Sequence, residues 1–158
     1  MKVLHKTVFF SALALFLAFG ARLNAQNCGC TTYGPLKASL GELVVAASRA
    51  QGTAQQVSTF ASNGNANQLA RKITKLSNEM SDIQTIGNQI VQFPVSDRLI
   101  YLEMRNLSEQ FSGDVAAFNA IYRANNAGIV VIADALRASL NAHKGGASEI
   151  RIGICCRD

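Results

Sequence analysis

The sequence has no tryptophan, only two prolines, and four cysteines that all lie near its ends. Because the cysteines are at 28, 30, 155 and 156, no disulfide can join residues within 31–154. Proline breaks helices, and it occurs only as Pro35 and Pro94, so each proline marks a boundary and long helices can form between them. Only 16% of the residues are charged, and there is no internal repeat.

Histidine is also scarce, which removes several kinds of catalytic and metal site. His143 is the only histidine after residue 25, so the paired Glu-x-x-His motifs of di-iron bundles and the C-x-x-C-H haem signature are both missing. No G-x-S-x-G context supports a Ser-His-Asp triad, and no glycine-rich loop could cradle a phosphate. We therefore predict that the chain is not an enzyme and holds no cofactor or metal. We expect His143 to be an exposed cation in the last turn of a helix.

The first 25 residues have the layout of a secretory signal peptide. Lys2 and Lys6 make a basic start, residues 8–20 form an apolar run, and Ala25 provides a small residue at the cleavage position. A membrane-spanning helix needs about 20 apolar residues, so this run is too short for a stable anchor. We predict cleavage after residue 25, a single exported domain over 26–158, and no stable membrane span in it. Its location would be the periplasm, the cell surface or the extracellular medium.

The positive charge of the whole chain depends largely on this leader. The formal charge is +5, but Lys2, Lys6 and Arg22 would be lost with the signal peptide, leaving 12 basic and 10 acidic residues. A net charge of +2 gives little attraction for phosphate backbones, so we predict no nucleic-acid partner.

Apolar residues recur at alternating steps of four and three along most of the remaining chain. This spacing is typical of helices that pack nearly parallel to their neighbours, and it predicts helices at about 35–62, 65–93, 96–125 and 128–143. Asn63 or Asn65 can cap the second helix. Ser96 can cap the third, with Asp97 near the positive end of its dipole. The fourth helix is expected to end at Gly145-Gly146.

These lengths predict an all-α fold, an up-down antiparallel bundle of four helices in which the fourth is shorter. The tail over 145–158 is expected to be extended and to return toward the start of the first helix, since 10 residues can span up to about 33 Å. The alternative is a three-helix form in which the third and fourth segments make one continuous helix. That form would separate the two cysteine pairs.

The four cysteines are expected to form disulfides, because cysteines in exported proteins usually pair. Neighbouring cysteines are too close for an unstrained bond, so we predict that Cys28 and Cys30 crosslink to Cys155 and Cys156, in either of two connectivities. A four-thiolate Zn²⁺ or Cu(I) site is the alternative, but C-x-C and C-C are tighter than the usual zinc spacings.

Two segments suggest a partner surface. Residues 128–136 are apolar around much of the helix, with Val130 and Val131 off its main face, and the tail alternates Ile150, Ile152 and Ile154 like a strand. The expected function is an exported non-enzymatic structural or protein-interaction module, for example a subunit or accessory of a cell-surface or secretion assembly, with a protein partner or self-association. The alternatives are an extracytoplasmic carrier of a small apolar ligand or cofactor within the bundle, and a thiol or metal-binding protein that uses the four cysteines.

Overall fold

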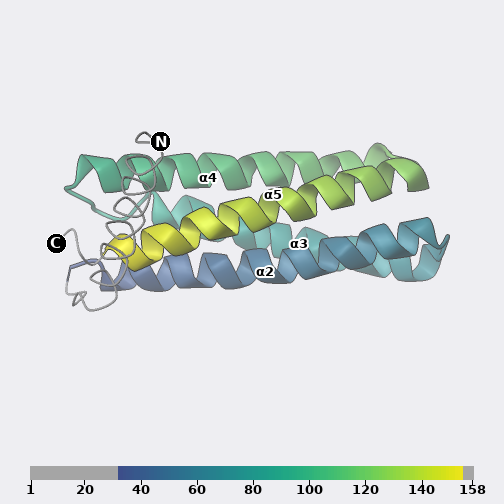
Figure 1. Ribbon diagram of the computed structural model, residues 1–158, viewed down its shortest axis with the longest axis horizontal. Coiled ribbons are helices and arrows are strands. Elements are labelled where there is room, and N and C mark those ends of the chain that lie inside the picture. Colours follow the sequence, from purple (N-terminus) through teal and green to yellow (C-terminus); the bar gives the residue numbers. More distant parts are fainter. Residues whose placement is uncertain (1–31, 155–158) are drawn as a thin grey trace, which may run out of the picture.

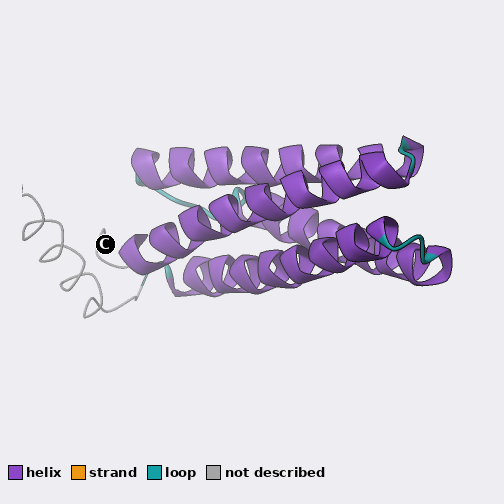
Figure 2. Cartoon of the chain, turned by 45° about the vertical axis from the view of Figure 1, so that its right-hand side comes forward, coloured by secondary structure: helices purple, strands orange, loops and turns teal. Residues whose placement is uncertain are grey.

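The computed structural model of the chain describes residues 32–154, which form four long helices and one short 3₁₀ turn (Figure 1). The helices are α2 (Gly34–Ser62), α3 (Ala66–Ile90), α4 (Arg98–Asn119) and α5 (Asn126–Gly153), and the turn η1 (Ala120–Arg123) comes directly after α4. Between residues 32 and 154 no segment is a strand, as the secondary-structure colouring of Figure 2 shows. The all-α antiparallel bundle predicted from the apolar spacing is confirmed.

Three helices begin at a side chain that accepts hydrogen bonds from the first turn. Asn65 accepts from Gln68 N, Asp97 accepts from Leu99 N and Ile100 N, and Asn125 accepts from Gly128 N. Such caps satisfy backbone donors that have no partner within the helix. The turn before Asn65 needs a left-handed residue, and Gly64 provides it with φ of 67°. These caps mark where α3, α4 and α5 begin.

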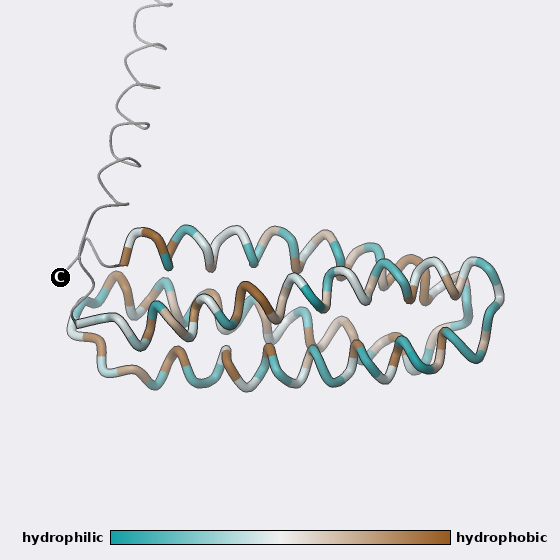
Figure 3. The backbone as a smooth tube through the Cα atoms, turned by 90° about the horizontal axis from the view of Figure 1, so that it is seen from below, coloured by the Kyte–Doolittle hydropathy of each residue, from teal (hydrophilic) through white to brown (hydrophobic). Residues whose placement is uncertain are grey.

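The four helices share one core. Each helix packs on the two beside it in the order α2, α3, α4, α5, and α5 closes the ring by returning to α2. Hydrophobic positions recur at intervals along every helix instead of forming one continuous run (Figure 3). The largest fully buried side chains include Leu40, Met80, Met104 and Phe111, one or more from each of α2, α3 and α4. Among the described helices, none is both long enough and apolar enough to cross a membrane.

Helix α5 lies obliquely across the bundle. It begins beside the end of α4 and finishes beside the start of α2, so α4 and α5 diverge along their length (Figures 1 and 2). The contact of α5 with α2 is its most extensive. Alanines allow close approach there, because Ala47, Ala50 and Ala54 of α2 and Ala133 and Ala147 of α5 are all fully buried. Close packing on α2 therefore draws the end of α5 away from α4.

The prediction for the fourth helix was wrong in its length and in the structure of the segment after residue 143. Helix α5 has 28 residues against 22 for α4, and it continues through Gly145 and Gly146 to Gly153. Two glycines destabilise a helix by about 2 kcal/mol, but stopping there would expose Ala147, Ile150 and Ile154. Ala147 and Ile154 are buried and Ile150 packs against the core, so their burial outweighs the glycine penalty.

The extended tail and its strand-like alternation are corrected by the same observation. On a helix, Ile150, Ile152 and Ile154 do not share one side: Ile154 is 1% exposed and Ile152 is 45% exposed. The chain also breaks between α4 and α5, where Asn125 caps a new helix, so the continuous three-helix alternative does not apply.

The beginning and end of the described chain lie together. The start of α2 and the end of α5 are side by side at one end of the bundle (Figures 1 and 2). A Cβ on Gly41 of α2 would lie 3.2 Å from Arg151 Nε of α5, which confirms that the two helices touch there. The predicted crosslinks among Cys28, Cys30, Cys155 and Cys156 fall outside the described residues.

Candidate functional site

A buried carboxylate joins α4 to α5 in the middle of the bundle. The side chain of Asp114, on α4, is 4% exposed, and both of its oxygens accept hydrogen bonds from α5. Ser139 Oγ donates to Oδ1 at 2.6 Å, and His143 Nδ1 lies 2.7 Å from Oδ2. The ring of His143 also packs edge to face on Phe111, with centroids 5.7 Å apart. This Asp–His–Ser cluster links α4 to α5 through one buried carboxylate.

The position of His143 contradicts the expectation of an exposed terminal cation. Because α5 continues to Gly153, His143 lies inside the helix instead of in its last turn. Its side chain is 21% exposed. Steps of four and three lead from Leu136 through Leu140 to His143, and they place the imidazole on the face that packs against α4.

Asp114 fixes the chemistry that His143 can offer. The carboxylate can only accept a hydrogen bond, so Nδ1 of His143 carries the proton that joins them. In the neutral ring, Nε2 is then left as an acceptor. No residue between 32 and 154 makes a hydrogen bond to Nε2. Because Nε2 is not a buried atom, solvent reaches it. With a neutral ring the cluster presents one oriented acceptor at the surface, and with a protonated ring it presents one oriented donor.

An apolar groove lies over this cluster, between α4 with η1 on one side and α5 on the other. Its volume is about 520 Å³. We call it the α4–α5 groove; its lining residues are Gln110, Gly113, Asp114, Ala117, Ala120, Val131, Ile132, Ala135, Leu136, Ser139 and His143. Val131 is 69% exposed, which is unusual for a valine in a helix that is otherwise well packed. Gly113, Ala117 and Ala120 on the α4 side are too small to fill the space between the two diverging helices.

Two smaller hollows each share one lining residue with the α4–α5 groove. Toward the start of α4, a hollow of about 320 Å³ shares Gln110 with the groove and includes Glu103 and Glu149. Toward the end of α4, a hollow of about 310 Å³ shares Ala120 and includes Arg123. The first of these hollows lies between α4 and α5, whereas the second is lined by residues of α4, η1 and Ala124 only and includes none from α5.

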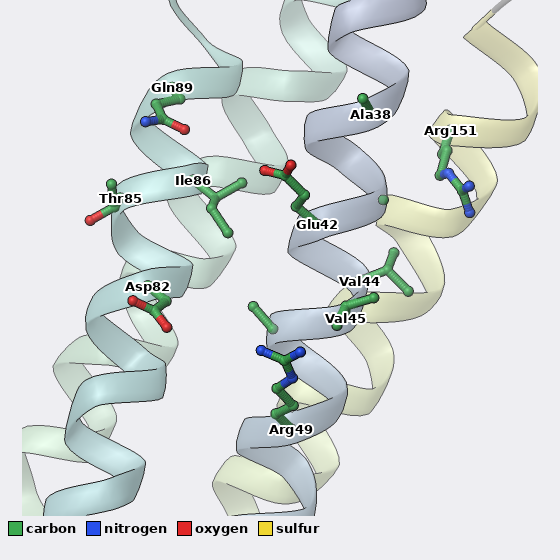
Figure 4. Close-up of a pocket in the computed structure, with 12 residues that line it drawn as sticks. Ala38, Glu42, Val44, Val45, Arg49, Asp82, Thr85, Ile86, Gln89 and Arg151 are labelled. Atoms are coloured by element: carbon green, nitrogen blue, oxygen red, sulfur yellow. The ribbon is translucent and has the colours of Figure 1, made fainter.

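A larger hollow of about 680 Å³ lies along the opposite side of the bundle, between α2 and α3 (Figure 4). Its rim carries exposed charged side chains of both signs, among them Glu42, Arg49 and Asp82. Arg151 lies on α5, across α2 from Asp82, so the charges do not converge on one point (Figure 4). Water solvates such a rim well, and we regard this hollow as a cleft between two solvated helix faces.

The five predicted partner-surface residues are in different environments. Val131 lines the α4–α5 groove, and Ile152 is 45% exposed on the outer side of α5. Val130 and Ile150 pack partly against the core, and Ile154 belongs to it. The structure therefore leaves Val131 and Ile152 accessible and does not bring the five together as one surface.

The Asp–His–Ser cluster was missed at the sequence level, although the spacing contained a signal for it. The apolar stripe of α4 can be traced from Phe111 through Val115 to Tyr122, but Asp114 and Ile121 are the buried residues. A strict sequence of four and three puts Asp114 in the core of α4 and His143 in the core of α5. Two ionisable residues at core positions of neighbouring helices predict a pair, because each would be costly to bury alone.

Electrostatic interactions elsewhere on α3 and α4 are local. Arg105 Nε lies 2.9 Å from Glu109 Oε1, and this hydrogen bond, with the charge of Glu109, raises the pKa of the exposed Arg105. Glu79 is buried beside Lys75 at 3.7 Å, and its Oε2 has no hydrogen-bond partner. Between residues 32 and 154, no three His, Cys, Asp or Glu side chains gather closely enough to hold a metal ion.

No protein-family model matches the sequence, and no curated protein or solved structure matches it significantly.

Proposed function

We propose that this chain is an exported, non-enzymatic interaction module that holds another protein in the α4–α5 groove, as a subunit or accessory of a cell-surface or secretion assembly. The single observation that carries the proposal is the apolar groove itself, in which Val131 is 69% exposed. Export is proposed on the layout of residues 1–25, which supplies the basic start, apolar run and small residue of a signal peptide.

The shape of the groove favours a helix or extended segment of a protein. Two diverging helices leave a furrow whose walls are Val131, Ala117, Ala135 and their neighbours, and apolar side chains spaced along a partner helix can enter such a furrow. Burying an exposed valine side chain fully contributes about 1.5 kcal/mol or more. Nε2 of His143, held in place by Asp114, offers a hydrogen bond that would fix the register of a partner with a matching polar group.

The arrangement of the polar cluster also supports a non-enzymatic role. In a Ser-His-Asp triad the imidazole accepts the serine proton and the aspartate orients the imidazole. Here Ser139 and His143 both donate to Asp114, so the hydroxyl is not activated by the ring. We propose that the cluster joins α4 to α5 and orients His143.

The proposal is tested by comparing two exposed valines. Val131→Asp places a charge in the α4–α5 groove, and Val45→Asp places the same charge on α2, where Val45 is 49% exposed beside the other hollow. Tagged variants are recovered from the native host after crosslinking, and the attached proteins are identified and quantified by mass spectrometry. A specific protein should be lost from Val131→Asp and retained by Val45→Asp. The proposal fails if both variants retain the same proteins as the unaltered chain.

A second candidate is a carrier of a small apolar ligand, and one observation favours it. The groove volume of about 520 Å³ falls within the range of small-molecule sites, roughly 300–1,000 Å³, and a few polar groups converge at His143. Native mass spectrometry of chain purified without detergent would detect a bound molecule. Ala135→Trp, which fills the groove, should remove that added mass. A spectrum that contains the mass of the chain alone would reject this candidate.

A further inference from the structure

The first turn of α4 carries a group of exposed apolar side chains. Leu99 is 67% exposed, Leu102 is 45% exposed and Tyr101 is 41% exposed. These are three of the seven large apolar side chains that are exposed between residues 32 and 154, and they lie within four consecutive positions. Single exposed apolar residues are ordinary on a protein surface, whereas a contiguous group indicates an interaction site. We call these three residues the Leu99–Leu102 patch.

The patch is the outer side of a turn whose inner side lies in the core. Successive residues of a helix are about 100° apart, so Leu102 points away from the fully buried Ile100, and Leu99 and Tyr101 lie on the two flanks. Helices α4 and α5 diverge toward this end of the bundle, so α5 does not cover the start of α4 (Figures 1 and 2). Within the described part of the chain, the three side chains therefore remain accessible.

The charges near the patch are of both signs. Arg98 is exposed and makes no ion pair with any residue between 32 and 154. Asp97 caps α4 on one side of the patch, and Glu103 follows it on the other. A partner held here would therefore gain mainly from burial of apolar surface, and Arg98 could meet one negatively charged group.

The way in which the chain enters the bundle indicates what this end faces. Helix α2 begins at the same end of the bundle as α4 (Figure 1). The residues before α2 include the apolar run over 8–20, which on the proposed route of export enters the membrane first. The 11 residues from 21 to 31 can span at most about 40 Å. The end that carries the patch is therefore held close to the bilayer until the leader is removed.

We infer that the Leu99–Leu102 patch docks this end of the bundle on the surface of a lipid bilayer. Leucine side chains enter the boundary between headgroups and acyl chains, tyrosine prefers the level of the headgroups, and Arg98 can reach a lipid phosphate. A few inserted side chains give weak, reversible binding, comparable at most with that of a single acyl chain.

The inference goes beyond the proposed function, because it assigns a second surface to the protein. Val131, in the α4–α5 groove, lies near the start of α5 at the opposite end of the bundle. A chain docked on lipid through the start of α4 would therefore leave the α4–α5 groove accessible to a protein partner.

The absence of tryptophan makes a direct test possible. Tyr101→Trp places a single fluorescent reporter in the patch, and Tyr122→Trp is the matched control, because Tyr122 is 61% exposed in η1 at the opposite end. Vesicles of phosphatidylcholine mixed with phosphatidylglycerol are added to the exported chain up to roughly millimolar lipid, a range suited to weak insertion. The emission from position 101 should shift to shorter wavelength and be quenched by brominated lipid. The emission from position 122 should do neither.

A second pair of variants tests the role of the leucines. Leu99→Gln combined with Leu102→Gln, in the chain that carries Tyr101→Trp, should weaken lipid binding by roughly tenfold. Val45→Gln, an equally apolar and exposed position on α2, should leave lipid binding unchanged. Circular dichroism checks that every variant keeps its helices.

Three results would overturn the inference. The first is an unchanged emission from position 101, and the second is an equal shift from positions 101 and 122. The third is a shift at position 101 that appears on raising the protein concentration without vesicles, which would assign the patch to a second copy of the chain. These variants leave the α4–α5 groove unaltered, so loss of another protein from Val131→Asp would still support the proposed function in each case.

Discussion

Replacing Gly145 and Gly146 by alanine should stabilise the protein. Both glycines lie inside α5, and a Cβ at either position would meet no atom within 4 Å. Alanine in a helix interior is favoured over glycine by about 1 kcal/mol, because an unfolded chain with alanine has fewer conformations to lose on folding than one with glycine. With no clash to subtract, the double substitution should raise the free energy of unfolding by about 2 kcal/mol. For a domain of this size that corresponds to roughly 7 °C in the melting temperature.

The assay is urea unfolding monitored by far-ultraviolet circular dichroism. The midpoint should rise with an unchanged slope, and the signal of the folded state should also stay unchanged, because residues 145–153 are already helical. Gly64→Ala is the matched control: Gly64 has φ of 67°, so the same substitution there should destabilise the protein by about 1 kcal/mol. A gain of helical signal in the double variant, or a fall in its midpoint, would refute a continuous α5.

Three further predictions concern the polar cluster, a helix cap and the ends of the chain. Asp114→Ala leaves two donors without their acceptor and should lower the free energy of unfolding by about 2 kcal/mol. Ser139→Ala removes one hydrogen bond and should lower the free energy of unfolding by about 1 kcal/mol. Equal losses of the two variants in urea unfolding would argue against the cluster. Asp97→Ala removes the cap of α4 and should lower thermal stability by about 1 kcal/mol, an effect that Asp97→Asn should largely avoid. Peptide mapping without reduction should find Cys28 and Cys30 joined to Cys155 and Cys156, since α2 begins beside the end of α5. Bonds within each pair, or four free thiols, would contradict this prediction.

Most of the bundle can be predicted from local patterns in the sequence. The apolar steps of four and three locate both ends of α2 and α3 to within three residues and the start of α4 to within two. Helix α4 ends at Asn119, six residues before the predicted 125, where the chain tightens into the 3₁₀ turn η1. Asn65 is readable as a cap because its role depends only on the residues immediately after it. The cap of α4 was expected at Ser96, with Asp97 near the positive end of the helix dipole, and the structure has it one residue later, at Asp97.

The end of α5 was mispredicted because a local signal opposed a non-local one. Gly145-Gly146 is typical of a helix end, but Ala147, Ile150 and Ile154 continue the stripe that packs on the bundle. The size of that gain depends on contact with α2, which the local sequence does not contain. The divergence of α5 from α4, and so the α4–α5 groove, depends on the same contact and could not be predicted from either helix alone.

The proposed function is tested most directly by a photo-crosslinking amino acid placed at Val131 or, for comparison, at Val45, in chain expressed by its native host. Both positions are exposed and both are valines on helices, so differences in accessibility are small. If the α4–α5 groove is the contact surface, a crosslink to one identified protein, or to a second copy of this chain, should form from position 131 and be absent or much weaker from position 45. Equal crosslinking from both positions, or none from position 131, would contradict the proposal.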